Sequence, residues 1–515
     1  MKSLKNIIQR DFTKLHSKTL IQLKRLWAKE IGYIPKNSQV LNAYQQILKT
    51  KKVKPSAKFE ESLITRKIRT QSGVAPMAVM TKPFACPGKC IFCPLEKGMP
   101  KSYLSDEPAA QRAKKVKFDP KLQISSRLKQ LAATGHNTDK IEIIVIGGTF
   151  SAYPDSYKIE FFKGIYDSLN GQKSSSLEKA QHINETAKHR VVGISVETRP
   201  DWITTKEVKL LRKLGVTKVQ LGVQALDEKI LKTIKRGHSI EPIAKATQLL
   251  KNAGFKICYH FMPNLPGSTP QKDLSMAKIM FEDSRFKPDY LKVYPVQVIP
   301  NTQLHKLFEQ GKFTTYTDQV LKKVLKGIKA VTPPWVRIDR LVRDISKQWV
   351  SSGTMQTNIR QVIQQELKDE NEICQCIRCR EIKNSLHSGH LYLKKISIDT
   401  LGGQEYFLSF ESNGRLYSLL RLRLPDKDQS VLFKELSKAA IIREVHTFGK
   451  ALTLSEHNTS KAQHQGLGKK LIAHATKISK QNGYQKLAVI SAIGTKEYYL
   501  KLGFKKAGLY MTKDI

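Results

Sequence analysis

The chain has few acidic side chains for its 515 residues and no apolar run long enough to cross a bilayer. It contains 44 Asp plus Glu against 89 Lys plus Arg, a formal net charge of +45. Such an excess repels itself unless a polyanion neutralises it, which favours a nucleic-acid partner; a generally basic surface is the alternative. The N-terminus also lacks the apolar core of a signal peptide. We therefore expect a soluble cytoplasmic protein.

Cysteine is scarce, and its placement excludes a secreted disulfide framework. Six of the seven cysteines fall in two tight clusters, a spacing typical of metal ligands in a reducing compartment. The seventh, Cys258, stands alone in an apolar stretch and is predicted to be an ordinary core residue.

The first cluster has the spacing Cys86-x3-Cys90-x2-Cys93. Three thiolates on one short loop can ligate three irons of a 4Fe-4S cluster and leave the fourth iron without a protein ligand. An open iron can bind a small molecule and pass it an electron. A structural zinc site is the alternative, but such a site usually has four protein ligands. The spacing resembles that of the radical S-adenosylmethionine (SAM) enzymes, in which the open iron chelates that cofactor.

The pattern of the chain divides it into four regions. Residues 1–75 alternate apolar and basic positions at helical spacing, and residues 1–80 hold 17 basic against 4 acidic side chains. This predicts a basic helical region that binds nucleic acid, although a solvated helical bundle would look similar. From 76 to 330, short β-branched runs alternate with amphipathic helices, which indicates a parallel sheet or partial β/α barrel. The expected strands are 141–146, 191–196, 218–223 and 291–294. A connector over 331–387 carries the second cysteine cluster, and an α/β domain covers 388–515.

Polar motifs follow the expected strands of the barrel, where such folds place their sites. Gly147 and Gly148 follow the first strand, and their backbone can approach a ligand closely, although a glycine pair is often just a turn. Glu197 and Arg199 follow the next one. They offer the acceptor and donor that an amino-acid moiety needs, with a surface ion pair as the alternative.

The second cluster, Cys374-x-Cys376-x2-Cys379, predicts a structural zinc site between the two large domains. A histidine would be the simplest fourth ligand. His387 and His390 are close in sequence, and a distant histidine could serve equally.

The C-terminal domain carries a glycine-rich segment that opens an expected helix over 471–479. Glycines at this point expose the first N–H groups and the positive end of the helix dipole, an arrangement that binds pyrophosphate. The Gln-x-x-Gly-x-Gly form resembles the acyl-CoA-binding loop of the GNAT acetyltransferases, and implies contacts from Gln463, Gln465, Gly466, Leu467, Gly468 and Lys469. Tyr498 and Tyr499 resemble the same family's closing helix, where one tyrosine contacts the thioester or donates a proton; packing is the alternative for both.

The two motif sets in one basic chain resemble the catalytic subunit of Elongator, a tRNA-modifying enzyme family also described as lysine acetyltransferases. The likeness runs from about residue 60 to the end. It includes Arg69-Thr-x-Ser-Gly-Val-Ala, 147–150, 197–201, 222–224, 236–238, 343–345, 443–446, 463–466 and 494–499. The compact cysteine loop and the loosely similar N-terminal segment indicate a prokaryotic stand-alone enzyme.

The resemblance implies a radical SAM partial barrel followed by a GNAT α/β domain, behind a basic helical region. It implies a 4Fe-4S cluster, SAM, acetyl-CoA and zinc, with an electron donor and tRNA as partners and no membrane. The implied reaction places a carboxymethyl group on C5 of the wobble uridine. Arg66, Lys67 and Arg69 would bind tRNA. A homodimer is compatible with the sequence, and no obligate complex is inferred. The alternatives are a protein lysine acetyltransferase with a structural cluster, in which Glu444 would act as base, and a non-catalytic tRNA-binding scaffold.

Overall fold

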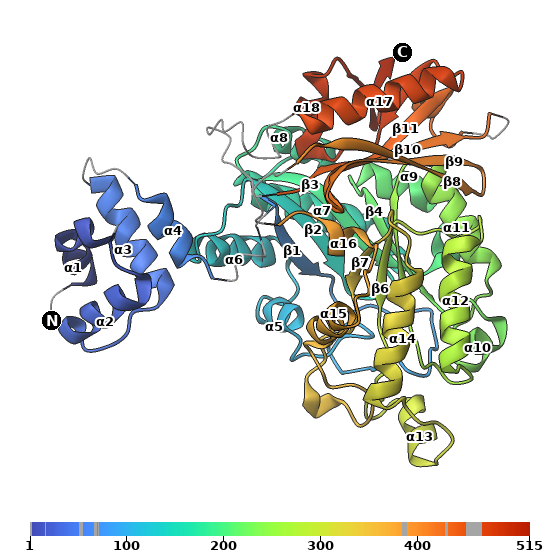
Figure 1. Ribbon diagram of the computed structural model, residues 1–515, viewed down its shortest axis with the longest axis horizontal. Helices are drawn as coiled ribbons and strands as arrows, with labels where there is room; N and C mark the ends of the chain where they lie inside the picture. The colour runs from blue at the N-terminus through green and yellow to red at the C-terminus, as the bar shows by residue number, and fades with distance from the viewer. Residues whose placement is uncertain are drawn as a thin grey trace.

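The computed structural model describes residues 3–15, 17–50, 55–65, 70, 72–383, 389–427, 431–449 and 466–515. These residues form a small helical lobe, a half-barrel of parallel strands and a second, mixed sheet. Figure 1 shows the lobe projecting from one side of the half-barrel and the second sheet lying across one end of it.

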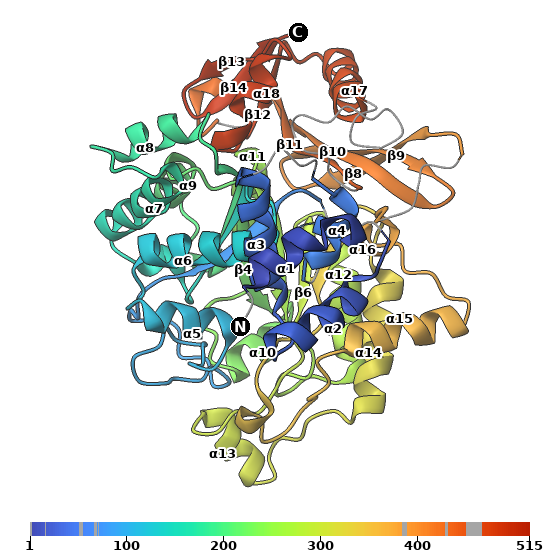
Figure 2. The same ribbon diagram turned by 90° about the vertical axis from the view of Figure 1, so that its left-hand side faces the viewer.

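The N-terminal lobe is helical, as predicted. Its elements are α1 (Leu4–Arg10), a 3-10 turn (Phe12–Leu15), α2 (Leu20–Ile31), α3 (Asn37–Thr50) and α4 (Ala57–Leu63). They enclose a core of their own around the fully buried Trp27 and Tyr44. The lobe meets the half-barrel where Gly135 packs against Leu41 and Ile64. Figure 2, which faces the lobe, shows α1 to α4 in front of the half-barrel. Arg66, Lys67 and Arg69 lie outside the described residues.

The first sheet contains seven parallel strands in sequential order. They are β1 (Ala75–Met80), β2 (Lys140–Ile146), β3 (Arg190–Thr198), β4 (Lys218–Gln224), β5 (Lys256–Phe261), β6 (Tyr290–Val293) and β7 (Arg337–Arg340). The four strands expected from sequence are confirmed. The barrel also extends beyond residue 330, because β7 falls in the region expected to be a connector.

Helices follow the strands and cover the outer face of the sheet (Figure 1). They are α5 (Pro108–Lys115), α6 (Pro120–Ala133), α7 (Asp155–Asn170), α8 (Leu177–Asn184), α9 (Thr205–Lys213), α10 (Glu228–Thr233), α11 (Glu241–Asn252), α12 (Pro270–Glu282) and α14 (Asp318–Val331). Helix α13 (Gln303–Glu309) lies apart from the sheet, at the lower edge of the view in Figure 1. Strand residues that face these helices are apolar and buried, for example Ile143, Val219 and Ile257. The alternate strand residues face the inside of the half-barrel, where several are polar.

The second sheet has the order β13-β14-β12-β11-β10-β9-β8 and is antiparallel except where β11 pairs with β12. Its strands are β8 (Tyr392–Thr400), β9 (Gly403–Ser412), β10 (Arg415–Pro425), β11 (Ala439–Thr447), β12 (Lys486–Val489), β13 (Lys505–Ala507) and β14 (Tyr510–Asp514). Helix α17 (Leu467–Gln481) packs on β9, β10 and β11, and α18 (Lys496–Leu500) precedes β13. Two helices, α15 (Ile359–Asp369) and α16 (Ile377–Arg380), connect this sheet to the half-barrel.

The second sheet docks on the end of the half-barrel where the strands begin. Arg190, the first residue of β3, donates to Glu497 at 2.9 Å. A network of buried charges lies nearby: Arg443 Nη1 is 2.8 Å from Glu405 Oε1 and 3.0 Å from Asp289 Oδ1. Arg421, Arg423 and Lys251 extend this network. Because apolar residues of both domains also share one core, the two domains form a continuous body.

None of the helices in the described part of the chain is both long and apolar enough to cross a membrane.

Candidate active site

The first cysteine cluster lies on the loop that follows β1. Two backbone hydrogen bonds fix this loop: Ile91 N donates to Ile234 O at 3.1 Å, and Leu304 N donates to Ile91 O at 2.9 Å. Cys90 is buried, and Cys86 and Cys93 are half-buried. Burial, together with the neighbouring Cys90, raises the pKa of the Cys93 thiol to about 11.

Cationic side chains surround this loop. Arg236 Nη1 lies 3.4 Å from Cys90 Sγ, and its Nε has no hydrogen-bond partner in the described structure. Arg199 Nη1 is also buried without a partner there. A Cβ added to Gly88 would lie 2.6 Å from that atom, so the glycine lets the guanidinium approach the loop. Three thiolates on a cluster would supply the negative charge that these guanidinium groups lack.

Glu197 and Arg199 both lie in the site, but they do not pair with each other. Glu197 accepts from Tyr103 Oη at 2.6 Å and from Lys292 Nζ at 3.3 Å. Although burial raises its pKa, Lys292 and His260 bring the net pKa below the usual value. Arg199 holds Asp201 through two hydrogen bonds of 3.0 and 2.8 Å. The alternative of a surface ion pair is therefore wrong.

The sequence analysis missed Tyr103, Lys292 and His260, which come from a loop and two further strands. The alternation Tyr290-x-Lys292-x-Tyr294 was the available signal, because polar residues at every second position of a buried strand face a polar space.

Gly147 and Gly148 directly follow β2 and have backbone conformations that favour glycine, at φ values of 134° and 95°. A Cβ on Gly147 would overlap Thr81 Oγ1, so no other residue fits without a shift of the loop. Gly148 lines the cavity together with Thr149. Thr149 Oγ1 lies 3.6 Å from Cys86 Sγ, which places this glycine turn beside the cysteine loop.

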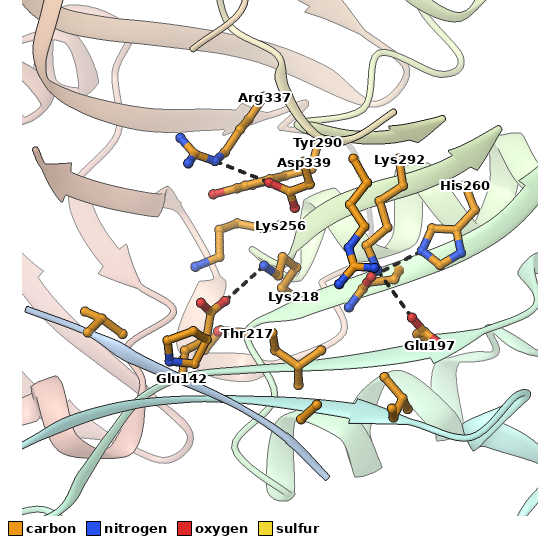
Figure 3. Close-up of a pocket in the computed structure, with 18 of the residues that line it drawn as sticks. Glu142, Glu197, Thr217, Lys218, Lys256, His260, Tyr290, Lys292, Arg337 and Asp339 are labelled. Carbon is orange, nitrogen blue, oxygen red and sulfur yellow. Dashed lines mark hydrogen bonds and ion pairs between the residues drawn. The ribbon is translucent and has the colours of Figure 1, made fainter. Parts of the chain in front are cut away.

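One cavity of about 2170 Å³ runs from the cysteine loop through the half-barrel to the second domain. Its inner wall consists of the inward-facing strand residues shown in Figure 3. Glu197 and His260 lie near the carboxyl ends of β3 and β5, and Glu142, Lys218 and Lys256 lie toward the strand beginnings, on the other side of the view in Figure 3. Lys256 and His260 are four residues apart along β5, so the distance between their positions is about 13 Å at a rise of about 3.3 Å per residue. The predicted cysteine site and the predicted acyl-CoA site therefore line the same cavity. Their relative placement could not be predicted from the sequence.

The far end of the cavity contains the N-terminus of α17. Gly466, Leu467, Gly468 and Lys469 line it, and Gly466 caps the helix with a left-handed backbone at φ 66°. Gln463 and Gln465 lie outside the described residues.

The two predicted tyrosines differ in their surroundings. A Cβ added to Gly468 would lie 2.8 Å from the Tyr498 hydroxyl, so this tyrosine stands directly over the glycine segment. Tyr498 is 40 % exposed, whereas Tyr499 is buried and packs against Phe504. Of the two, Tyr498 is placed to contact a ligand of the glycine segment.

Glu444 lines the same cavity, but its geometry does not suit a general base. Oε1 accepts from the Tyr290 hydroxyl at 2.5 Å, and Oε2 accepts from Arg421 Nε at 2.8 Å. Burial raises the pKa of this carboxyl, but Arg421 and Lys256 outweigh that effect and hold the pKa at about 2. A carboxylate this acidic, with both oxygens engaged, is a poor proton acceptor near neutral pH.

The second cysteine cluster forms a compact group. The sulfur atoms of Cys374, Cys376 and Cys379 all lie within 4.8 Å of one another. Ligands of one tetrahedral zinc are about 3.8 Å apart, given a Zn–S distance of about 2.3 Å. The buried Lys329 donates to Cys379 Sγ at 3.4 Å, which favours the thiolate. In the described residues no other three Cys, His, Asp or Glu ligand atoms come this close.

The first cysteine cluster differs from the second in how close its sulfur atoms lie. The sulfur atoms of Cys86, Cys90 and Cys93 do not form a group this compact in the described structure, which is compatible with a multi-iron cluster. His390 is exposed and is not part of the compact group, and His387 lies outside the described residues. Cys258 is buried in β5, and burial raises the pKa of its thiol to about 12, consistent with a core residue.

Comparisons with known proteins agree with this arrangement. The Radical SAM superfamily model matches residues 81–278, and the Radical_SAM C-terminal domain model matches residues 288–369. The chain is 43 % identical to the tRNA uridine(34) acetyltransferase of Dehalococcoides mccartyi, over 87 % of this chain and 99 % of the relative. It is 41 % identical to the protein of that name from Methanocaldococcus infernus, over 97 % and 96 %.

Eukaryotic relatives and a solved structure extend the likeness. The chain is 35 % identical to human Elongator complex protein 3, over 88 % of this chain and 86 % of the relative. The solved archaeal Methanocaldococcus infernus Elp3 with an N-terminal deletion superposes with a TM-score of 0.76 at 39 % identity. That match covers 86 % of this chain and 100 % of the solved chain.

Proposed function

The chain belongs to the radical SAM family of the tRNA uridine(34) acetyltransferases and Elongator complex protein 3, and from that premise we propose its reaction. The enzyme places a carboxymethyl group on C5 of the wobble uridine of tRNA in the cytoplasm, and the two added carbons come from acetyl-CoA. The observation that carries this proposal is the single cavity lined by both the cysteine loop and the start of α17. A protein acetyltransferase would have no use for that connection.

The residues of the cysteine loop fit a 4Fe-4S cluster and SAM. Cys86, Cys90 and Cys93 would hold three irons, while the unpartnered Arg199 Nη1 and the exposed backbone of Gly148 would face the cofactor. When bound, these groups supply the one-electron chemistry that turns the methyl group of an acetyl thioester into a carbon radical. Such a radical can add to C5 of uridine, which ordinary acyl transfer cannot modify; the C5 hydrogen then leaves as a proton, and one electron passes back to the electron-donor partner. The chain's own contribution is to hold both reactants in one water-restricted space.

The second domain would bind the acetyl thioester. The first N–H groups of α17 and its helix dipole favour the pyrophosphate of acetyl-CoA, with Gly466 and Gly468 allowing close approach. Tyr498 stands over this segment, where its hydroxyl can donate to the thioester or to the leaving thiol.

The RNA binds the basic rim of the cavity and the N-terminal lobe. Basic side chains among the lining residues include Arg112, Arg127, Lys140, Arg360, Arg378 and Lys383. The wobble base has to leave the anticodon stack to enter the half-barrel, as expected for recognition of a single-stranded loop. The compact group of Cys374, Cys376 and Cys379 would hold a structural zinc between the two domains.

The test is an anaerobic reaction with reconstituted cluster, reductant, SAM, acetyl-CoA and unmodified tRNA, followed by mass analysis of the digested nucleosides. We expect 5-carboxymethyluridine from the wild type and none from Cys90→Ala. Cys258→Ala removes a buried thiol of the same barrel that is outside the loop, and should retain activity.

An intact cluster that cleaves SAM without modifying uridine would refute the proposal. Acetylation of a protein substrate under the same conditions would favour the rival function.

A further inference from the structure

Five large inward-facing side chains form a row where the strands of the half-barrel begin: Glu142, Lys218, Lys256, Tyr290 and Arg337. Four of them have partners. Lys218 Nζ is 3.0 Å from Glu142 Oε1, Tyr290 donates to Glu444 at 2.5 Å, and Arg337 pairs with Glu381 and Asp339. Lys256 makes no side-chain hydrogen bond or ion pair with any described residue, and the neighbouring charges of Glu444, Lys218 and Glu142 act on it only through space.

The position of Lys256 makes an unpaired ammonium group destabilising for the folded protein. It lies directly opposite Lys218 in the β4–β5 ladder, where like charges destabilise a sheet. Burial lowers the pKa of its ammonium, and Glu444 acts on it only through space. Figure 3 shows its side chain beside the Glu142–Lys218 pair, with no interaction drawn from Lys256 to either residue. A lysine held in this way is suited to an anion that arrives with the substrate or forms during the reaction.

We propose that Lys256 binds the carboxylate that the reaction creates on the modified uridine. This inference rests on the proposed function. Hydrolysis of the uridine-linked thioester consumes water, breaks the C–S bond and releases CoA thiol and a proton, while the carboxymethyl group stays on C5 of the uridine. The negative charge forms first on the tetrahedral oxygen and then remains on the carboxylate.

The charge of the ligand distinguishes product from substrate. Uracil is neutral near pH 7, so an unmodified wobble base gives the Lys256 ammonium no direct ion-pair partner, and only the more distant carboxylates of Glu444, Glu142 and Asp289 act on it through space. The carboxymethylated base supplies such a partner. A backbone phosphate is the other anion that RNA could bring, but phosphates are served by the arginine and lysine residues at the rim, whereas Lys256 lies on a strand inside the half-barrel.

The test measures binding and needs no cluster. Anticodon stem–loop RNAs carrying uridine, 5-carboxymethyluridine or its uncharged methyl ester at the wobble position are titrated against the full chain. We expect the wild type to bind the carboxymethyl RNA about tenfold more tightly than the other two, the equivalent of about 1.4 kcal/mol. Lys256→Met should remove this preference without changing the affinity for the unmodified RNA, and Lys256→Arg should retain most of it.

Lys140→Met is the matched control, because Lys140 lines the same cavity and also lacks an ion-pair partner among the described residues. Because Lys140 belongs to the basic rim proposed to bind phosphate, this variant should weaken the binding of all three RNAs equally and leave the preference at the wild-type value. The inference is overturned if Lys256→Met keeps the preference, if the wild type has none, or if Lys256→Met weakens all three RNAs equally, as loss of a phosphate contact would. The modification assay fails or succeeds independently of these outcomes, so the two proposals are tested separately.

Discussion

The buried charges between the two domains give a sharp prediction for Arg443→Met. The Arg443 side chain is fully buried and binds Asp289 and Glu405, so its loss leaves two buried carboxylates short of a cation. Removing one partner of a buried ion pair costs about 3–5 kcal/mol. We expect a value near the lower figure, because Arg421 and Lys251 remain beside the same carboxylates.

The assay is urea unfolding near neutral pH, followed by a signal from the domain interface. Arg285→Met is the matched control, because Arg285 pairs with Asp283 at 2.7 Å but its side chain is 49 % exposed. An exposed pair contributes under about 1 kcal/mol. A stability loss for Arg443→Met no larger than that of Arg285→Met would refute the reasoning.

The pH dependence of the same variant has a definite sign. Burial raises the pKa values of Asp289 and Glu405, but Arg443 and its neighbours outweigh this effect and hold both pKa values below their usual range. Carboxyls with depressed pKa values stabilise the folded state above their unfolded pKa values of about 4, and this contribution disappears as pH falls through the folded values. The stability difference between wild type and Arg443→Met should therefore be largest near neutral pH and shrink on acidification.

Three further predictions concern the site. Gly147→Ala should overlap Thr81 and lower the stability by about 1–3 kcal/mol, and iron analysis after reconstitution should show reduced cluster loading. Cys376→Ser should lose the bound zinc, measured as metal per chain, whereas equal zinc in variant and wild type would contradict the assignment. Tyr498→Phe should slow the formation of 5-carboxymethyluridine at least about tenfold, while Tyr499→Phe should stay near wild type; the reverse order would be inconsistent with the geometry.

Local patterns accounted for much of the fold. The strands around Ile143, Val191 and Val219 could be predicted because β-branched residues are concentrated there, and the cysteine loop because its three ligands are adjacent in sequence. Three strands, β1, β5 and β7, were not named from the sequence, and the last two share a reason. Both alternate apolar residues with charged or polar ones, as in Lys-Ile-Cys-Tyr-His-Phe and Arg-Ile-Asp-Arg. Such alternation is typical of a strand with one face in water, and here the polar face lines an internal cavity.

The rest of the site depends on contacts between distant parts of the chain. Glu197 was found because it follows a strand, but Tyr103 and Lys292, which hold it, are 94 and 95 residues away in the sequence. Lys256 could not be recognised from sequence, because its significance comes from the partners it lacks. The engagement of Glu444 by Tyr290 was equally hidden, and it changes the expected role of that carboxylate.

The charged interface between the domains also bears on how the chain is made. A ribosome completes the half-barrel before strands β11 to β14 emerge, so the docking end of the barrel meets water for some time without its cover. Asp289 and Lys251 lie at that end, and water solvates their charged groups well. This disfavours aggregation with other nascent chains. The same groups destabilise the protein if the second domain docks incorrectly, because they are then buried without their ion-pair partners. A charged interface of this kind therefore suits a large protein whose domains fold one after the other during synthesis.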